Sequence, residues 1–203
     1  MVYGFVRLAF WALIFFVAYF WIVRKSKIVK KKRVLVIVLI LCMLLSTVSS
    51  LFPVENVLIR FETPQEAHNY FRPGNIVNVV YGNGSSLVIY STAPNSHSVV
   101  IFPRDRGGYV LPSLFSVRRI IQGQAGTPDS VLFNVYSVIG TDDYFITGLI
   151  ILETDIAYIV DSNGNNVDFE SIRMSDFLIV IYFFVESFSH DFYFLVNGYK
   201  ISF

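Results

Sequence analysis

The pattern of apolar and polar positions divides the chain into two long apolar runs followed by many shorter ones. Residues 2–23 contain one charged residue, Arg7, and residues 34–52 contain none. Each run approaches the roughly 20 residues that a helix needs to cross a bilayer. We therefore predict a transmembrane helical hairpin in residues 1–53, with spans over about 2–23 and 34–52, and with Pro53 ending the second helix.

A basic loop, residues 24–33, joins the two runs and holds seven of the sixteen lysines and arginines. Short loops rich in these residues stay on the cytoplasmic side of a membrane. The sequence therefore predicts a multi-pass cell-membrane protein with two spans, this loop inside and both termini outside. Such a loop also attracts anionic lipid, but this attraction follows from its charge and does not by itself indicate a regulatory patch.

The second run has an alternative interpretation as an internal signal sequence with a cleavable end. Small residues at Thr47 and Ser49 provide the pattern that such cleavage needs. A run that reaches span length favours retention in the membrane, so we expect both spans to be kept.

Arg7 lies near the outer end of the first run, where two interpretations compete. It can snorkel toward the head groups, or it can be the buried partner of another charge within the membrane. Neither run contains an acidic residue. We therefore expect Arg7 to snorkel.

Residues 54–203 alternate between short apolar runs and turn signals, which is typical of a β domain. Thr63, Pro64 and Glu66 form a helix start, and Pro73 stops the one short helix that we predict. Residues 177–185 form an apolar run too short for a third span, so we predict a buried central strand there. The fold class is therefore mainly β: an antiparallel sandwich or barrel with one short helix after the transmembrane hairpin. The strands are expected at about 56–62, 76–81, 86–91, 97–102, 109–122, 131–139, 144–152, 156–160, 167–174, 177–185, 192–196 and 199–203.

Charge is divided unevenly between the two parts of the chain. All fifteen aspartates and glutamates follow residue 53. Residues 54–203 contain only eight lysines and arginines, so their net charge is −7. Such a domain repels phosphate, so we exclude nucleic acid as a partner. The same repulsion should hold it off an anionic lipid surface within a Debye length of about 8 Å. We expect the lipid bilayer as one partner and name another envelope or membrane protein as a candidate second one.

Candidate catalytic residues are poorly placed for nucleophilic chemistry. Ser189, His190 and Asp191 are neighbours, and neighbouring residues of a strand point to opposite faces, which argues against a catalytic triad. Two carboxylate pairs at strand ends are hypotheses for acid–base chemistry: Asp142 with Asp143, and Glu153 with Asp155. We assign no catalytic residue.

Metal-binding patterns are also incomplete. His68, His97 and His190 have no paired ligand spacing. The turn that begins at Asp161 places Asn163 and Asn165 as a calcium loop would, but Gly164 comes too early and Ile172 stands where the bidentate glutamate belongs. We predict a plain hairpin turn there, leading into the strand from Val167, with calcium as the alternative, and assign neither a metal nor a cofactor.

The stretch Phe61–Tyr70 and the following strand Gly82–Tyr90 carry a resemblance to a protein group. They resemble uncharacterised small membrane-anchored proteins of Gram-positive bacteria, which share an F-x-T-P-x-E-A-x-x-Y segment. The resemblance implies a bacterial envelope setting and no particular activity. It transfers no functional residue to this chain.

Topology and the lack of a catalytic constellation together predict a non-enzymatic binding or interaction module, anchored in the membrane and exposed outside a bacterial cell. An aromatic-lined groove for a glycan or a peptide is one form this could take, although the 32 phenylalanines and tyrosines are also expected in a β core. Two alternatives remain. One is an envelope enzyme that uses paired carboxylates in a β cleft, and the other is an accessory subunit that acts through its two spans.

Overall fold

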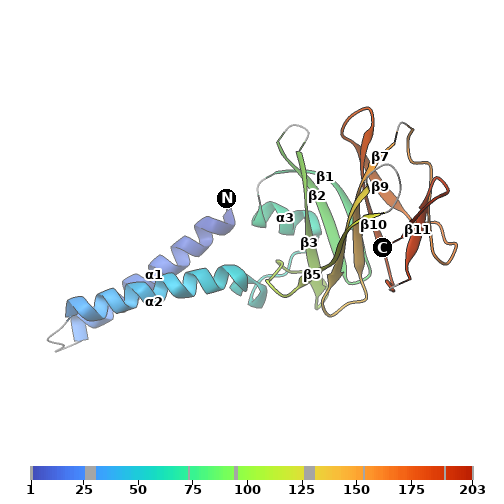
Figure 1. The fold of residues 1–203 in the computed structure, drawn as a ribbon. Coiled ribbons are helices and arrows are strands. Elements are labelled where there is room, and N and C mark those ends of the chain that lie inside the picture. The colour runs from blue at the N-terminus through green and yellow to red at the C-terminus, as the bar shows by residue number, and fades with distance from the viewer. Residues whose placement is uncertain are drawn as a thin grey trace.

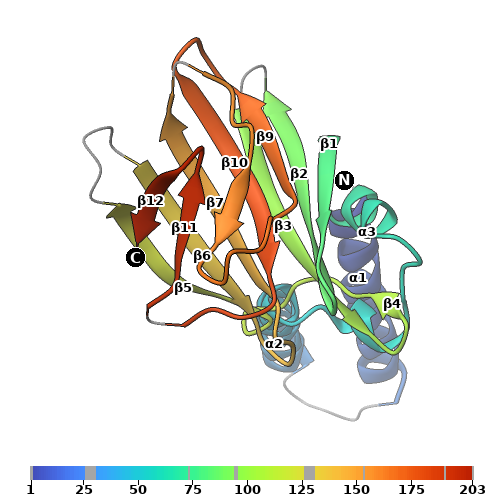
Figure 2. The same ribbon diagram turned by 90° about the vertical axis from the view of Figure 1, so that its right-hand side faces the viewer.

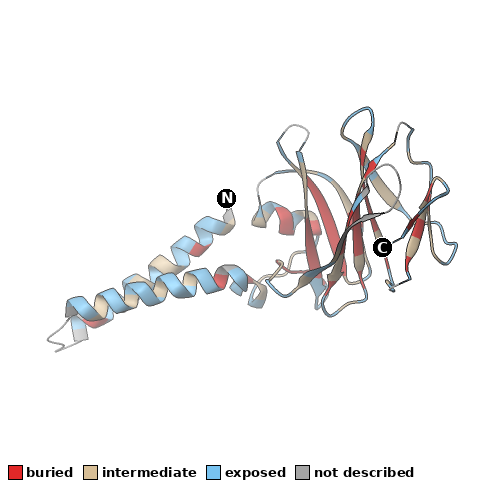
Figure 3. Ribbon diagram, viewed as in Figure 1, coloured by how far each residue is buried: buried red, intermediate tan, exposed pale blue. Residues whose placement is uncertain are grey.

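A hairpin of two long apolar helices, α1 (Val2–Lys25) and α2 (Lys31–Leu51), extends from a β body in the computed structural model (Figure 1). The structure describes all residues except 1, 26–30, 73, 94–95, 126–130, 153, 190 and 203. Both helices are long and apolar enough to cross a membrane. Only 11% of the apolar stretch of each helix is buried within the protein. Figure 3 shows this contrast with the buried strands of the β body. Residues 26–30, half of the predicted basic loop, lie outside the described residues, and the loop's cytoplasmic placement stays a prediction.

Arg7 is buried against Glu55, and the expectation of a snorkelling side chain was wrong. Its Nε donates to Oε1 of Glu55 at 3.0 Å, and its Nη2 donates to Oε2 at 3.1 Å. Each residue is 7% exposed. Glu55 belongs to a short 3-10 helix, η1 (Val54–Val57), that follows α2 directly. The two apolar runs contain no acidic residue, but η1 places one against α1 from just beyond the second run.

The first turn of α1 packs against α3 (Pro64–Phe71), the short helix of the β body. The Tyr3 ring lies 5.9 Å from that of Tyr70 and 5.1 Å from that of Phe71. The guanidinium of Arg7 lies 4.4 Å from the centre of the Tyr3 ring. The hairpin and the β body are therefore joined at two places, through the chain after α2 and through the start of α1 (Figure 1).

The start of α3 forms as the sequence predicts. Thr63 is the N-cap, its Oγ1 accepts a hydrogen bond from Glu66 N at 3.2 Å, and Pro64 occupies the first turn. The carboxylate of Glu66 accepts from Glu62 N at 3.1 Å. Ala67 is fully buried against the sheet beneath, so this short helix covers one face of the β body.

Twelve strands are assigned within the described residues, and every pairing between them is antiparallel. Their bounds are β1 (Asn75–Tyr81), β2 (Ser85–Ala93), β3 (Ser96–Asp105), β4 (Gly108–Tyr109), β5 (Val117–Ala125), β6 (Val131–Val138), β7 (Tyr144–Ile151), β8 (Ile159–Asp161), β9 (Phe169–Arg173), β10 (Leu178–Val185), β11 (Tyr193–Val196) and β12 (Tyr199–Ser202). They form a first sheet in the order β1-β2-β3-β4, a second in the order β5-β6-β7-β10-β9 and a third in the order β12-β11-β8 (Figure 2). The predicted mainly β, antiparallel class is confirmed.

The second sheet is the middle layer, and the side chains of its strand β10 pack against both neighbouring sheets. Its side chains alternate: Ile181 and Phe183 pack in the cluster shared with the third sheet, whereas Val180 and Tyr182 pack in the cluster shared with the first sheet. A strand buried on both faces reads as a continuous apolar run, which is why the sequence predicted it correctly. Gly148 of the neighbouring strand β7 leaves the space that the Phe133 ring fills. From α3 outward, the β body is thus stacked as helix, first sheet, second sheet and third sheet.

Two local predictions were wrong. Residues 56–62 form no strand, because Asn56 belongs to η1 and its side-chain amide bonds both the N–H and the C=O of Leu111 at 2.8 Å. The strand expected at about 109–122 is also wrong over residues 110–116, because β4 ends at Tyr109 and β5 begins at Val117.

The turn that begins at Asp161 does close a short hairpin. Val160 and Asn166 form an antiparallel bridge, and Val167 N donates to the carbonyl oxygen of Ile159 at 2.9 Å. On their other sides, β8 pairs with β11 in the third sheet and β9 pairs with β10 in the second.

Candidate binding groove

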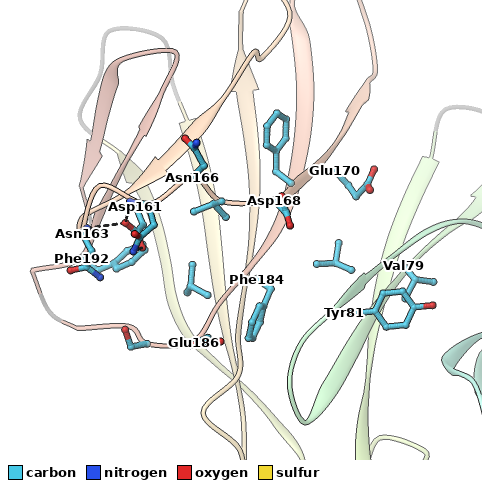
Figure 4. A pocket seen from close by; sticks show the side chains of 16 residues that line it. Val79, Tyr81, Asp161, Asn163, Asn166, Asp168, Glu170, Phe184, Glu186 and Phe192 are labelled. Atoms are coloured by element: carbon cyan, nitrogen blue, oxygen red, sulfur yellow. Dashed lines mark hydrogen bonds between the residues drawn. The ribbon is translucent and has the colours of Figure 1, made fainter.

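A groove of about 630 Å³ lies between the end of β1, the start of β9, the end of β10 and the turn after β8 (Figure 4). We call it the acidic groove. It is lined by Val79, Val80, Tyr81, Asp161, Asn163, Asn165, Asn166, Val167, Asp168, Phe169, Glu170, Phe184, Val185, Glu186, Ser187 and Phe192. The lining combines apolar and aromatic walls with many oxygen-bearing side chains. Grooves of this kind and size are suited to small molecules or to a few residues of a peptide.

Four carboxylates line the acidic groove, and none of the lining residues is a lysine, arginine or histidine. Asp161 and Glu186 have partners: Asp161 Oδ1 accepts from Asn165 N at 2.8 Å, and Glu186 Oε1 accepts from Asn83 Nδ2 at 3.1 Å. The carboxylates of Asp168 and Glu170 make no hydrogen bond or ion pair with any residue that the structure describes. Two acidic groups are therefore free to meet a ligand.

Two of the strands that line the groove are the last strands of their sheets. In the described part of the chain, β1 pairs only with β2, and β9 pairs only with β10. The last strand of a sheet presents backbone N–H and C=O groups that can pair with an added strand. The acidic groove therefore combines free carboxylates with free strand edges.

The Asp142–Asp143 pair does not converge on a cleft. Asp142 is exposed, whereas Asp143 is 1% exposed and accepts hydrogen bonds from Asn83 N at 3.2 Å, Gly84 N at 2.9 Å and the Ser85 hydroxyl. These donors belong to the turn between β1 and β2 and to the first residue of β2. Asp143 therefore fastens this turn to the second sheet.

The second carboxylate pair and the Ser189–Asp191 stretch are only partly described. Glu153 and His190 lie outside the described residues. Asp155 forms an exposed ion pair with Arg173 at 2.6 Å. We therefore build no acid–base or nucleophilic site from these residues.

The histidines and the Asp161 turn form no metal site within the described residues. His68 is fully buried with its ring 4.6 Å from that of Tyr90, and burial lowers its pKa, so the ring is neutral at neutral pH. The Asp161 carboxylate is used by its own turn, since it also accepts from Asn163 N at 2.9 Å, and Gly164 has a φ of 84°. These are the features of a turn built around an aspartate side chain.

The sequence pointed to Asp161, Asn163 and Asn165 and missed the other acidic members of the groove. Asp168 and Glu170 lie at the start of β9, Glu186 directly follows β10, and the pairing of β9 with β10 brings these two segments together. No local spacing marks such a cluster. No protein-family model, curated protein or solved structure matches this chain.

Proposed function

We propose that this chain is a non-enzymatic binding module, anchored in a bacterial cell membrane by α1 and α2, whose β domain lies outside and binds a cationic peptide segment of a partner protein. The acidic groove is the observation that carries this proposal. Its four carboxylates face no basic residue of the lining, and two of them are unpaired among the described residues.

The exposed apolar hairpin supports the membrane anchor. Side chains such as Leu13 and Met43 are more than half exposed, and burying apolar surface away from water is favourable by about 25 cal/mol per Å². A bilayer provides that burial along the whole length of both helices. The basic loop at the tip of the hairpin favours the orientation with the β domain outside.

Charge selects the partner. A recess lined by one sign of charge concentrates ligands of the opposite sign and speeds their association. Asp168 and Glu170 can pair with ammonium or guanidinium groups without displacing a partner from the described part of the chain. The ligand therefore carries lysine or arginine.

The free strand edges favour a peptide over an isolated amine. An extended segment can add to the edge of β1 or β9 through main-chain hydrogen bonds, and its alternate side chains then reach the groove. Tyr81 and Phe184 offer apolar surface to the stems of those side chains.

The test uses the full chain in nanodiscs of phosphatidylcholine, a lipid without net charge, and a fluorescent peptide of alternating lysine and valine. The double variant Asp168→Asn with Glu170→Gln should weaken peptide binding by about twofold to thirtyfold, since each of the two partly exposed ion pairs contributes about 0.2–1 kcal/mol. Fluorescence anisotropy measures the change in Kd.

The control removes the same two charges elsewhere. Asp142→Asn with Asp176→Asn changes two exposed carboxylates outside the groove and should leave Kd unchanged. Equal weakening by both double variants would show that the peptide senses only the net charge of the domain. Equal binding of a peptide in which glutamine replaces every lysine would contradict the proposed cationic specificity.

A further inference from the structure

Exposed apolar side chains gather where α2 meets the β domain. Val57, the last residue of η1, and Leu58, which follows it, are 81% and 87% exposed. We call the surface to which they belong the apolar base, and it consists of Phe52, Val54, Val57, Leu58, Leu114 and Phe115.

Two separate segments build the apolar base, and direct contacts hold them side by side. Leu114 N donates to the carbonyl oxygen of Leu51, the last residue of α2, at 2.9 Å. The rings of Phe52 and Phe115 lie 5.5 Å apart. The loop before β5 is therefore packed against the outer end of α2.

The base is nearly free of charge, although the domain is acidic. Residues 51–58 and 110–117 contain one ionisable residue between them, Glu55, and its carboxylate is paired with Arg7. The next residues along β5 are the exposed Arg118 and Arg119. The surface beside the hairpin is thus apolar, and two cations follow it along β5. The acidic groove is a different surface, lined by other residues.

The length of α1 sets the depth of this base. From Tyr3 to Ile22 the helix rises about 28 Å at about 1.5 Å per residue, close to the roughly 30 Å thickness of the hydrocarbon core. Tyr3 therefore lies near the outer surface of that core. Arg7 lies about one turn, or about 6 Å, deeper, and it bonds Glu55 directly. The residues around Glu55 share this depth.

We propose that the apolar base is inserted into the outer leaflet, so that acyl chains cover it and the β domain is seated in the membrane surface. This inference rests on the proposed membrane anchor. It replaces the expectation of a domain held off the lipid, which used the net charge of the domain rather than the charge of the face beside the bilayer. Lipid is the occupant because the base continues the apolar surface of α2 without a break. Arg118 and Arg119, the exposed cations that follow the base along β5, would then be able to pair with lipid phosphates.

The test places a fluorophore at one position at a time in full-length protein that lacks its native thiol through Cys42→Ser. The positions are Leu58→Cys and Phe115→Cys in the base, and Tyr199→Cys as a control at an exposed strand of the third sheet. The protein is reconstituted in vesicles of phosphatidylcholine and phosphatidylglycerol. Each label is exposed to aqueous iodide and, separately, to nitroxide-labelled lipid, and tryptophan quenching by the same lipid reports insertion of α1.

We expect the labels at positions 58 and 115 to lose their iodide quenching and to be quenched by the nitroxide lipid, with the reverse at position 199. Iodide quenching at all three positions, with tryptophan quenched by the nitroxide lipid, would overturn the seated domain and leave the membrane anchor standing. Tryptophan that the nitroxide lipid does not quench would overturn both.

Discussion

Replacing Glu55 by alanine is expected to destabilise the junction between the hairpin and the β domain by about 3–5 kcal/mol. Arg7 would then keep its charge in a buried position without the carboxylate that bonds it at 3.0 and 3.1 Å. Removing one partner of a buried ion pair costs more than removing both, because the remaining charge is uncompensated. The double variant Arg7→Leu with Glu55→Leu should therefore be more stable than the single variant.

Tryptophan fluorescence during unfolding in mixed detergent micelles measures this effect, because both tryptophans of the chain, Trp11 and Trp21, lie in α1. Trp11 is close to the junction, since its Nε1 donates to Ser49 Oγ at 3.2 Å. Glu62→Ala removes an exposed carboxylate and is the matched control. If the Glu55→Ala and Glu62→Ala variants show the same unfolding midpoint, the ion pair does not stabilise the junction.

Replacing Asp143 by alanine is expected to lower the free energy of unfolding of the β domain by about 3–5 kcal/mol. The buried carboxylate accepts from two backbone N–H groups and a hydroxyl of the turn between β1 and β2. Alanine would leave three donors without their charged acceptor, the buried Ser85 hydroxyl among them, and a hydrogen bond to a charged group contributes about 1.5–3 kcal/mol. Far-ultraviolet circular dichroism during denaturation follows the loss.

The adjacent residue provides the comparison for Asp143. Asp142 is exposed, so Asp142→Ala should change stability by no more than about 0.5 kcal/mol. Asp143→Asn should lie between the two, because its amide keeps one acceptor oxygen but turns an NH₂ group toward other donors. Equal stability of the Asp142 and Asp143 alanine variants would show that Asp143 does not stabilise the turn between β1 and β2.

Local pattern predicted most of the elements of this fold. The apolar runs of α1 and α2, the cap of α3 at Thr63 and the continuous run of β10 each carry their signal within one segment. Alternation also placed most strands to within a few residues. The three-sheet stack was not predictable in this way, because the side on which β8 or β9 pairs depends on strands distant in the sequence.

For the functional residues too, features within one segment were predictable and contacts between distant segments were not. Arg7 was noticed, but Glu55 was missed as its partner because it follows the second apolar run. The Asp161 turn was noticed as a possible site, whereas Asp168 and Glu170 looked like ordinary strand residues until β9 placed them beside that turn. Charge was visible in the sequence as a total for the domain, and only the fold separates the acidic groove from the apolar base.

The placement of the β domain outside the membrane is the central claim, and thiol accessibility tests it most directly. In intact bacterial spheroplasts carrying Cys42→Ser, a membrane-impermeant maleimide should label Tyr199→Cys, in the β domain, without permeabilisation. Ser26→Cys, in the basic loop, should be labelled only after the membrane is opened. The opposite pattern, with position 26 labelled in intact spheroplasts and position 199 protected, would contradict the account.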